Sequence, residues 1–141
     1  MSYSLTFSKA IITIVFVADK VEQGMYDFVP TKKISESLNL AGPTAVKILH
    51  NLVRSGLIET REGSKGGIRL AKRPSDITIL DIFNAIEYER PMFRLELNVN
   101  VKGEKPTKAQ LAINDILTNA ENKMKDSLNK ITIADLLKRL Y

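Results

Sequence analysis

The stretch that most constrains the fold of this chain is residues 34–72, ISESLNLAGPTAVKILHNLVRSGLIETREGSKGGIRLAK. It predicts a short helix with Thr31 as its N-cap, a turn over residues 39–42, and then a second helix. Gly42 at the N-cap and Pro43 at the first helical position suit the start of that second helix. Proline loses only a backbone donor there, and that donor has no partner in the first turn. The stretch therefore predicts a helix-turn-helix.

The second helix divides into two faces of different chemistry. Apolar residues recur at helical spacing and are expected to pack inward: Ala45, Ile48, Leu49, Leu52 and Val53. Polar residues, none of them acidic, recur on another face: Thr44, Lys47, Asn51 and Arg54. Basic and amide side chains suit a helix in the major groove of DNA, where they reach base edges and phosphates. An ordinary solvated face explains the same pattern, and this helix alone leaves both interpretations open.

A β-hairpin is predicted directly after Gly56, which ends the second helix. Residues 57–61 and 68–70 have strand character, and the EGSKGG segment between them is typical of a turn. A hairpin in this position is a wing, here spanning residues 57–72. Its candidate DNA contacts are Arg61, Ser64, Lys65, Gly66, Gly67 and Arg69. A plain surface hairpin is the alternative, but the ordered combination of helix, turn, helix and hairpin favours a wing.

Composition limits the classes of function. Lys and Arg number 21 against 16 Asp and Glu, which gives a formal charge of +5 and a pI near 9.5. This balance favours a polyanionic partner. The absence of cysteine excludes disulfides, thiolate nucleophiles and cysteine-ligated zinc or iron–sulphur clusters. The longest apolar run is too short to span a bilayer and no secretory signal is evident, so a cytoplasmic protein without membrane contact is expected.

Helices are also predicted on both sides of the helix-turn-helix and wing. Residues 4–23 contain the β-branched run IITIVFVA, which favours a strand by propensity, but the length of the segment favours a buried helix. Thr78 with Asp81 forms a capping box for a helix after the wing. Thr132 with Asp135 does the same for a short helix near the C-terminus.

A strand and a long helix are predicted between these two capped helices. Residues 93–101 alternate apolar and polar, which indicates a half-buried strand that pairs either with a second subunit or with its own domain. Thr107 and Gln110 resemble a capping box for a helix that ends near residue 128. Its apolar stripe favours a dimer interface over folding back on its own domain. The candidate interface residues are Ile113, Ile116, Leu117, Ala120 and Met124.

Taken together, these elements resemble the BadM/Rrf-two family of bacterial transcription regulators. The matching segments are ISESLNLAGPTAVKILHNLVRSGLI, EGSKGGIRLAK, PSDITILDIFNAIE and ITIADLL. The resemblance implies a homodimer, joined near residues 108–128, that binds a roughly palindromic operator. Family-like DNA contacts, carried over by position, fall on Gly42, Pro43, Thr44, Lys47, Ser64, Lys65, Gly66 and Gly67.

The chain departs from the pattern of this family in two respects. Glu62 stands where a basic residue is common, and Ile68 where an aromatic residue is frequent, so operator preference is expected to differ. Cluster-bearing members hold three cysteines in the interval that corresponds to residues 88–106, and this chain has none. We therefore predict a member without a metal or other cofactor. Its signal would be an unknown small molecule, a partner protein or its own abundance.

The predicted fold is mainly α with a small β-hairpin wing (α+β). A winged helix-turn-helix domain is expected over residues 1–87. Residues 88–141 supply a connecting strand or loop, the long dimerisation helix and a short C-terminal helix, which do not form an independent domain. The predicted function is sequence-specific regulation of transcription by a homodimeric repressor bound to double-stranded DNA. A winged-helix module that binds a protein instead of DNA is the alternative. An enzyme is not expected, because no nucleophile–base pair or phosphate-binding loop is apparent.

Overall fold

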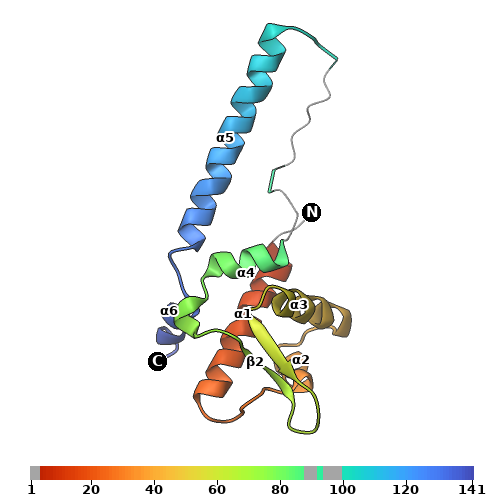
Figure 1. Cartoon of the computed structure of the whole chain (residues 1–141), viewed down its shortest axis with the longest axis vertical. Helices are drawn as coiled ribbons and strands as arrows, with labels where there is room; N and C mark the ends of the chain where they lie inside the picture. The colour runs from red at the N-terminus through yellow and green to blue at the C-terminus, as the bar shows by residue number, and fades with distance from the viewer. Residues whose placement is uncertain (1–3, 88–91, 94–99) are drawn as a thin grey trace.

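The first helix is the centre around which the rest of the domain packs. The computed structural model describes residues 4–87, 92–93 and 100–141. Helix α1 (Ser4–Glu22) contacts α4, β2, α6 and α3 (Figure 1). Ala10, Ile14 and Val17 on this helix are fully buried. Thr13 is also buried, and its hydroxyl donates to the Lys9 carbonyl oxygen at 2.7 Å. The prediction of a helix here, despite the β-branched composition, is confirmed.

The helix-turn-helix is formed by α2 (Thr31–Ser37) and α3 (Gly42–Arg54). Asn39 in the turn between them has a φ of 51°, a left-handed conformation that asparagine tolerates better than most residues. The fold element is as predicted, but both predicted N-caps are wrong by one residue. Pro30 occupies the N-cap of α2, and Ala41 that of α3, because the Ala41 carbonyl oxygen accepts the Ala45 N–H at 2.9 Å.

The predicted hairpin is confirmed, and a third segment joins it. Strands β1 (Ile58–Arg61) and β2 (Gly67–Leu70) pair antiparallel, with Ile58 opposite Leu70. On the other edge of β2, Val29 and Ile68 exchange both of their backbone hydrogen bonds at 2.8 Å. Since Val29 and Ile68 are both buried, this pairing fixes the base of the wing to the core.

The chain returns to the domain at its C-terminal end. After a single 3₁₀ turn, η1 (Pro74–Asp76), comes α4 (Ile79–Ile86), and α6 (Ile133–Lys138) packs beside them. Both predicted capping boxes, at the starts of α4 and α6, are present. The two helix starts are joined by backbone bonds at 2.9 Å, from the Ile79 N–H to the Ile131 oxygen and from the Ile133 N–H to the Ile77 oxygen. Ile133 and Leu137 of α6 complete the same hydrophobic core as α1.

Helix α5 (Glu104–Leu128) projects away from this domain (Figure 1). Its 25 residues span roughly 37 Å at about 1.5 Å per residue. Its start differs from the prediction, because Gly103 is the N-cap and the Thr107 hydroxyl donates to the Gly103 oxygen at 3.0 Å. Thr107 and Gln110 therefore form no capping box. None of the residues of α5 is buried within the chain.

The predicted strand over residues 93–101 falls largely outside the described residues, since 94–99 are not among them. The described residues at its two ends, Phe93 and 100–101, are not in a strand. Among the residues that the structure describes, no helix is both long enough and apolar enough to cross a membrane.

Candidate nucleic-acid interface

The outward face of α3 combines a cation with apolar side chains. Lys47 and His50 are exposed, and Val46 beside them is 68% exposed. Thr44 is half-buried at the start of the helix, next to the exposed Pro43. The opposite face packs into the core through Ala45, Ile48, Leu49 and Leu52, as predicted. An exposed valine next to a lysine suits a DNA groove, because thymine methyl groups offer apolar contacts and phosphates bind cations.

Two side chains of α3 lie on faces other than those predicted. Asn51, expected on the polar face, is only 8% exposed, whereas Val53, expected in the core, is 41% exposed. Asn51 follows the buried Ile48 by three positions and precedes Leu52, so it stands at the border between the two faces. Packing against the domain decides which side of that border it occupies. The placement of Asn51 on the exposed face is therefore wrong.

Arg54 is directed toward the body of the domain. It is the last residue of α3, and its Nη2 donates to the Ala85 carbonyl oxygen of α4 at 3.2 Å. This bond satisfies one of the carbonyl groups near the C-terminal end of α4, where four such groups lack helical partners. The Arg54 side chain thus joins α3 to α4, although it also lies on the polar face that the sequence predicted.

The tip of the wing presents one lysine. Ser64 and Lys65 are exposed, and the turn is closed by the Gly66 N–H donating to the Gly63 oxygen at 3.0 Å. Within the described part of the chain, Lys65 forms no ion pair. An ammonium at an exposed hairpin tip is free to approach a phosphate without first losing a carboxylate partner.

The paired glycines at the tip are required by the chain itself. A Cβ on Gly66 would lie 2.1 Å from the Arg61 oxygen, and one on Gly67 would lie 2.2 Å from the Val29 oxygen. Gly67 also has a φ of 148°, which side-chain-bearing residues rarely adopt. The glycines therefore permit the tight turn and the pairing with Val29, whatever contacts they make with DNA.

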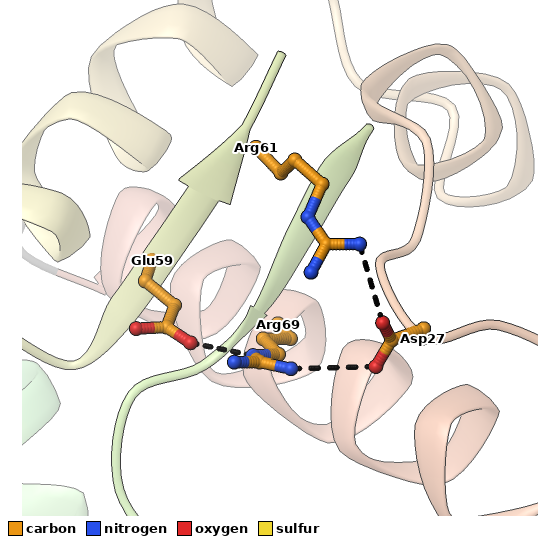
Figure 2. A network of polar contacts seen from close by, with 4 residues as sticks. All are labelled: Asp27, Glu59, Arg61 and Arg69. Atoms are coloured by element: carbon orange, nitrogen blue, oxygen red, sulfur yellow. Dashed lines mark hydrogen bonds and ion pairs between the residues drawn. The ribbon is translucent and has the colours of Figure 1, made fainter. Parts of the chain in front are cut away.

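The two wing arginines are held in a network on the side of the hairpin (Figure 2). Asp27, in the loop before α2, accepts from Arg61 and from Arg69 at 3.3 Å each. Arg69 also bonds Glu59 on β1, and this bond raises the pKa of Arg69. Both guanidinium groups lie over the Phe28 ring, with Cζ at 4.1 Å and 4.4 Å from its centroid.

This network balances its own charge, since two guanidinium groups face two carboxylates. The groups are solvent-exposed, so each pair adds little stability. Their effect is mainly positional, because Asp27 and Phe28 tie the wing to the loop that also supplies Val29. Neither Asp27 nor Phe28 could be identified as an anchor from the sequence of the wing. The only signal is their position, next to a buried valine.

This arrangement defines a class of protein. A helix-turn-helix whose second helix has a basic, acid-free outer face, followed by a hairpin fixed to the same core, is the winged helix-turn-helix of DNA-binding proteins. A family model described as "Iron-dependent Transcriptional regulator" matches residues 4–139. The chain belongs to the Rrf2 family of transcriptional regulators, and it is a DNA-binding regulator of transcription.

Individual proteins agree with this assignment. YffB of Lactococcus lactis, named as an HTH-type transcriptional regulator, is 31% identical over 115 residues, which are 76% of this chain and 74% of YffB. Among solved structures, IscR of T. potens superposes with a TM-score of 0.71 at 22% identity, covering 100% of this chain and 89% of IscR. CymR, the global cysteine regulator of B. subtilis, gives 0.67 at 23% identity, covering 99% and 98%. At these identities the two structures establish the fold.

The donor atoms of this chain can be compared with those that the iron named in the family description would need. Iron–sulphur clusters are held chiefly by cysteine thiolates, and the sequence contains no cysteine. Within residues 4–87, 92–93 and 100–141, no three His, Asp or Glu side chains are grouped so as to hold a metal ion. The residues present therefore do not fit a cysteine-ligated cluster.

Proposed function

We propose that the protein is a homodimeric repressor that binds a roughly palindromic operator, with α3 in the major groove and the wing tip on the adjacent backbone. The observation that carries this proposal is the outer face of α3, where Val46, Lys47 and His50 are exposed and no carboxylate stands among them. Helix α3 contacts β1, so the proposed recognition helix and the wing are adjacent in the fold. Thr44 and Lys47 would determine which DNA sequence is preferred, and Lys65 would add affinity for DNA of any sequence.

The structure narrows the set of contacts that we propose. We retain Lys47, Lys65, Thr44, Pro43 and Ser64 as proposed contacts, because none of them is buried, and we add the exposed Val46 and His50. Arg61 and Arg69 remain candidate phosphate contacts, although Asp27 and Glu59 already compete for part of their hydrogen-bonding capacity. Asn51 and Arg54 leave the proposed set, because the first is buried and the second is bonded to α4.

The dimer is proposed from α5. Ile113 and Ile116 are 51% and 66% exposed, and Ala120 is exposed on the same stripe. Leu117 and Met124 of that stripe are half-buried. An apolar stripe along a helix that projects from its own domain is stabilised by packing against a second copy. Since α5 projects from the end of the molecule opposite the wing, such a dimer leaves both wings free (Figure 1).

The test uses DNA fragments enriched from genomic DNA by the purified protein, starting with the region upstream of its own gene. Binding is followed by fluorescence anisotropy at several salt concentrations. Lys65→Ala should weaken binding to every sequence and reduce the slope of log K against log salt by about 1. Lys47→Ala should change the preference among operator variants by roughly 1–3 kcal/mol for the base pair that it contacts. Lys130→Ala is the matched control, because this exposed lysine lies after α5.

Two results would contradict the proposal. If Lys65→Ala and Lys130→Ala behave alike in affinity and in salt dependence, the wing does not contact the backbone. If the wild-type protein binds no DNA fragment even at low salt, the same surface is better explained as a site for a protein partner.

A further inference from the structure

A cavity lies on the domain between α1, the segment that follows β2, and α6. Its volume is about 840 Å³, within the range of roughly 300–1,000 Å³ typical of small-molecule sites. The interior is formed by apolar side chains from the three segments. These are Ala18, Val21, Leu70, Pro74, Ala134 and Leu137. Ala18 and Leu137 are buried and belong to the hydrophobic core, so the floor of the cavity is part of that core.

The rim of this cavity is basic. Lys72, Arg73 and Lys138 stand around it, and Glu22 is the one carboxylate among its lining residues. Arg73 is bonded to Asp76 at 2.9 Å, outside the cavity lining. In the part of the chain that the structure describes, neither Lys72 nor Lys138 forms an ion pair. Two ammonium groups from different segments therefore border an apolar interior, and neither is held in an ion pair, although Lys138 is near enough to Asp135 of α6 to help lower the pKa of that carboxyl.

One further side chain is fixed at this rim. The Tyr141 hydroxyl donates to Asp19 Oδ1 at 2.6 Å and accepts from Gln23 Nε2 at 3.0 Å. Because Asp19 lies on α1 and Gln23 directly follows it, these bonds hold Tyr141, three residues after α6, against the helix that forms the opposite wall. The two walls are thereby tied together at one end of the cavity.

We propose that this cavity binds a small organic carboxylate with an apolar body, which places its carboxylate between Lys72 and Lys138 and its body over Leu70 and Leu137. Charge complementarity selects an anion, and the apolar floor selects a ligand that is largely hydrocarbon. A cation of the same shape would meet Lys72, Arg73 and Lys138 and be rejected.

The position of the cavity connects it to the wing. Lys72 follows β2 by two residues, and the Ala71 N–H between them donates to the Leu57 oxygen at 3.0 Å just before β1. A ligand held by Lys72 and Lys138 would thus link the end of the wing to α6 and favour one position of the hairpin. The effect on DNA rests on the proposed function, whereas binding of the ligand does not.

The first experiment measures binding in the absence of DNA, by isothermal titration calorimetry of the full chain with decanoate below its micelle concentration. Decylammonium, which has the same tail and the opposite charge, is the ligand control. The double variant Lys72→Glu/Lys138→Glu should weaken decanoate binding at least about tenfold, because an attractive pair of charges becomes repulsive. Ala134→Trp should abolish binding by filling the cavity. Lys130→Glu, an exposed lysine outside the lining, should leave it unchanged.

The outcomes separate the proposals. Binding of decanoate with this pattern of variants, together with a change in operator affinity, supports both the site and its connection to the wing. No binding of decanoate, equal binding of decylammonium, or equal losses in the Lys130→Glu control would overturn the site. If Ala134→Trp changes the oligomeric state in sedimentation, the cavity is a subunit contact and the ligand site is wrong. None of these outcomes contradicts the separate proposal that the ligand-free protein binds an operator.

Discussion

The winged domain and α5 carry similar amphipathic patterns but bury them differently. We call the described residues 4–87 together with α6 the head. In the head, Ile14, Ile34, Ile48 and Leu52 are fully buried against other parts of the same chain. In α5, Leu111, Ile113 and Ile116 are all more than half exposed. A stripe of apolar residues therefore predicts that a helix face is to be covered, but it does not predict which chain covers it.

The largest expected effect comes from making the same deletion in both regions. Leu52→Ala removes a fully buried side chain from the head and should lower the free energy of unfolding by roughly 2–5 kcal/mol. Leu111→Ala on α5 should change it by at most about 0.5 kcal/mol, because this side chain is 61% exposed and lies opposite the proposed interface stripe. Urea unfolding followed by circular dichroism measures both free energies, and equal losses would contradict the distinction between the head and α5.

A smaller effect on the fold, but a large one on assembly, is expected from charges on α5. Ile113→Glu with Ile116→Glu should raise the dimer dissociation constant at least about 100-fold, because two carboxylates would be buried in an apolar contact. The unfolding transition of the head should remain in place. Thr118→Glu with Asn122→Glu puts the same charge on the opposite face of α5 as a control. Sedimentation equilibrium distinguishes them, and two equally dimeric double variants would remove the stripe as the interface.

The smallest effect concerns the return of α6 to the head. The Thr132 backbone N–H donates to the Asp135 carboxylate at 2.9 Å, and this bond, followed by the interaction with the Thr132 side chain, lowers the pKa of Asp135 from 3.8. A carboxyl group whose pKa is lower in the folded state stabilises the fold above pH 3.8, and this contribution is lost as the pH falls through the folded value. NMR titration should give a carboxyl pKa below 3.8 in the wild type and a higher one in Thr132→Ala. An unchanged pKa in the variant would show that the hydroxyl does not contribute.

Local chemistry was sufficient to predict most of the fold. The capping boxes at Thr78 and Thr132, the Asn39 turn and the glycine-rich hairpin each depend on residues that are close in sequence, and each is confirmed. The prediction that the long helix starts at a capping box on Thr107 is wrong, because Pro106 lies inside the first turn of α5. Proline is tolerated in the first turn of a helix, so α5 begins at Glu104.

The parts of the site that could not be predicted depend on contacts between distant residues. Asp27 reaches Arg61 across 34 positions, and Arg54 reaches Ala85 across 31, so neither bond leaves a pattern in a local window. Asn51 lies on a border between two helix faces, where periodicity alone does not predict whether a side chain is buried. Packing against the rest of the domain buries it. The basic outer face of α3 was visible in the sequence, whereas its two further exposed members, Val46 and His50, became evident only from burial.

The pairing of α6 with the start of α4 has a consequence for how the protein is made. During synthesis the N-terminal helices leave the ribosome first, yet Ile133 and Leu137 are needed to close the core that surrounds α1. The head therefore cannot finish folding until residue 137 has been translated and has left the exit tunnel. By then every residue of α5 has already been synthesised, so α5 is complete before the head can finish folding. A ribosome paused between residues 128 and 133 would hold a nascent chain that contains all of α5 but lacks the α6 residues that complete the core.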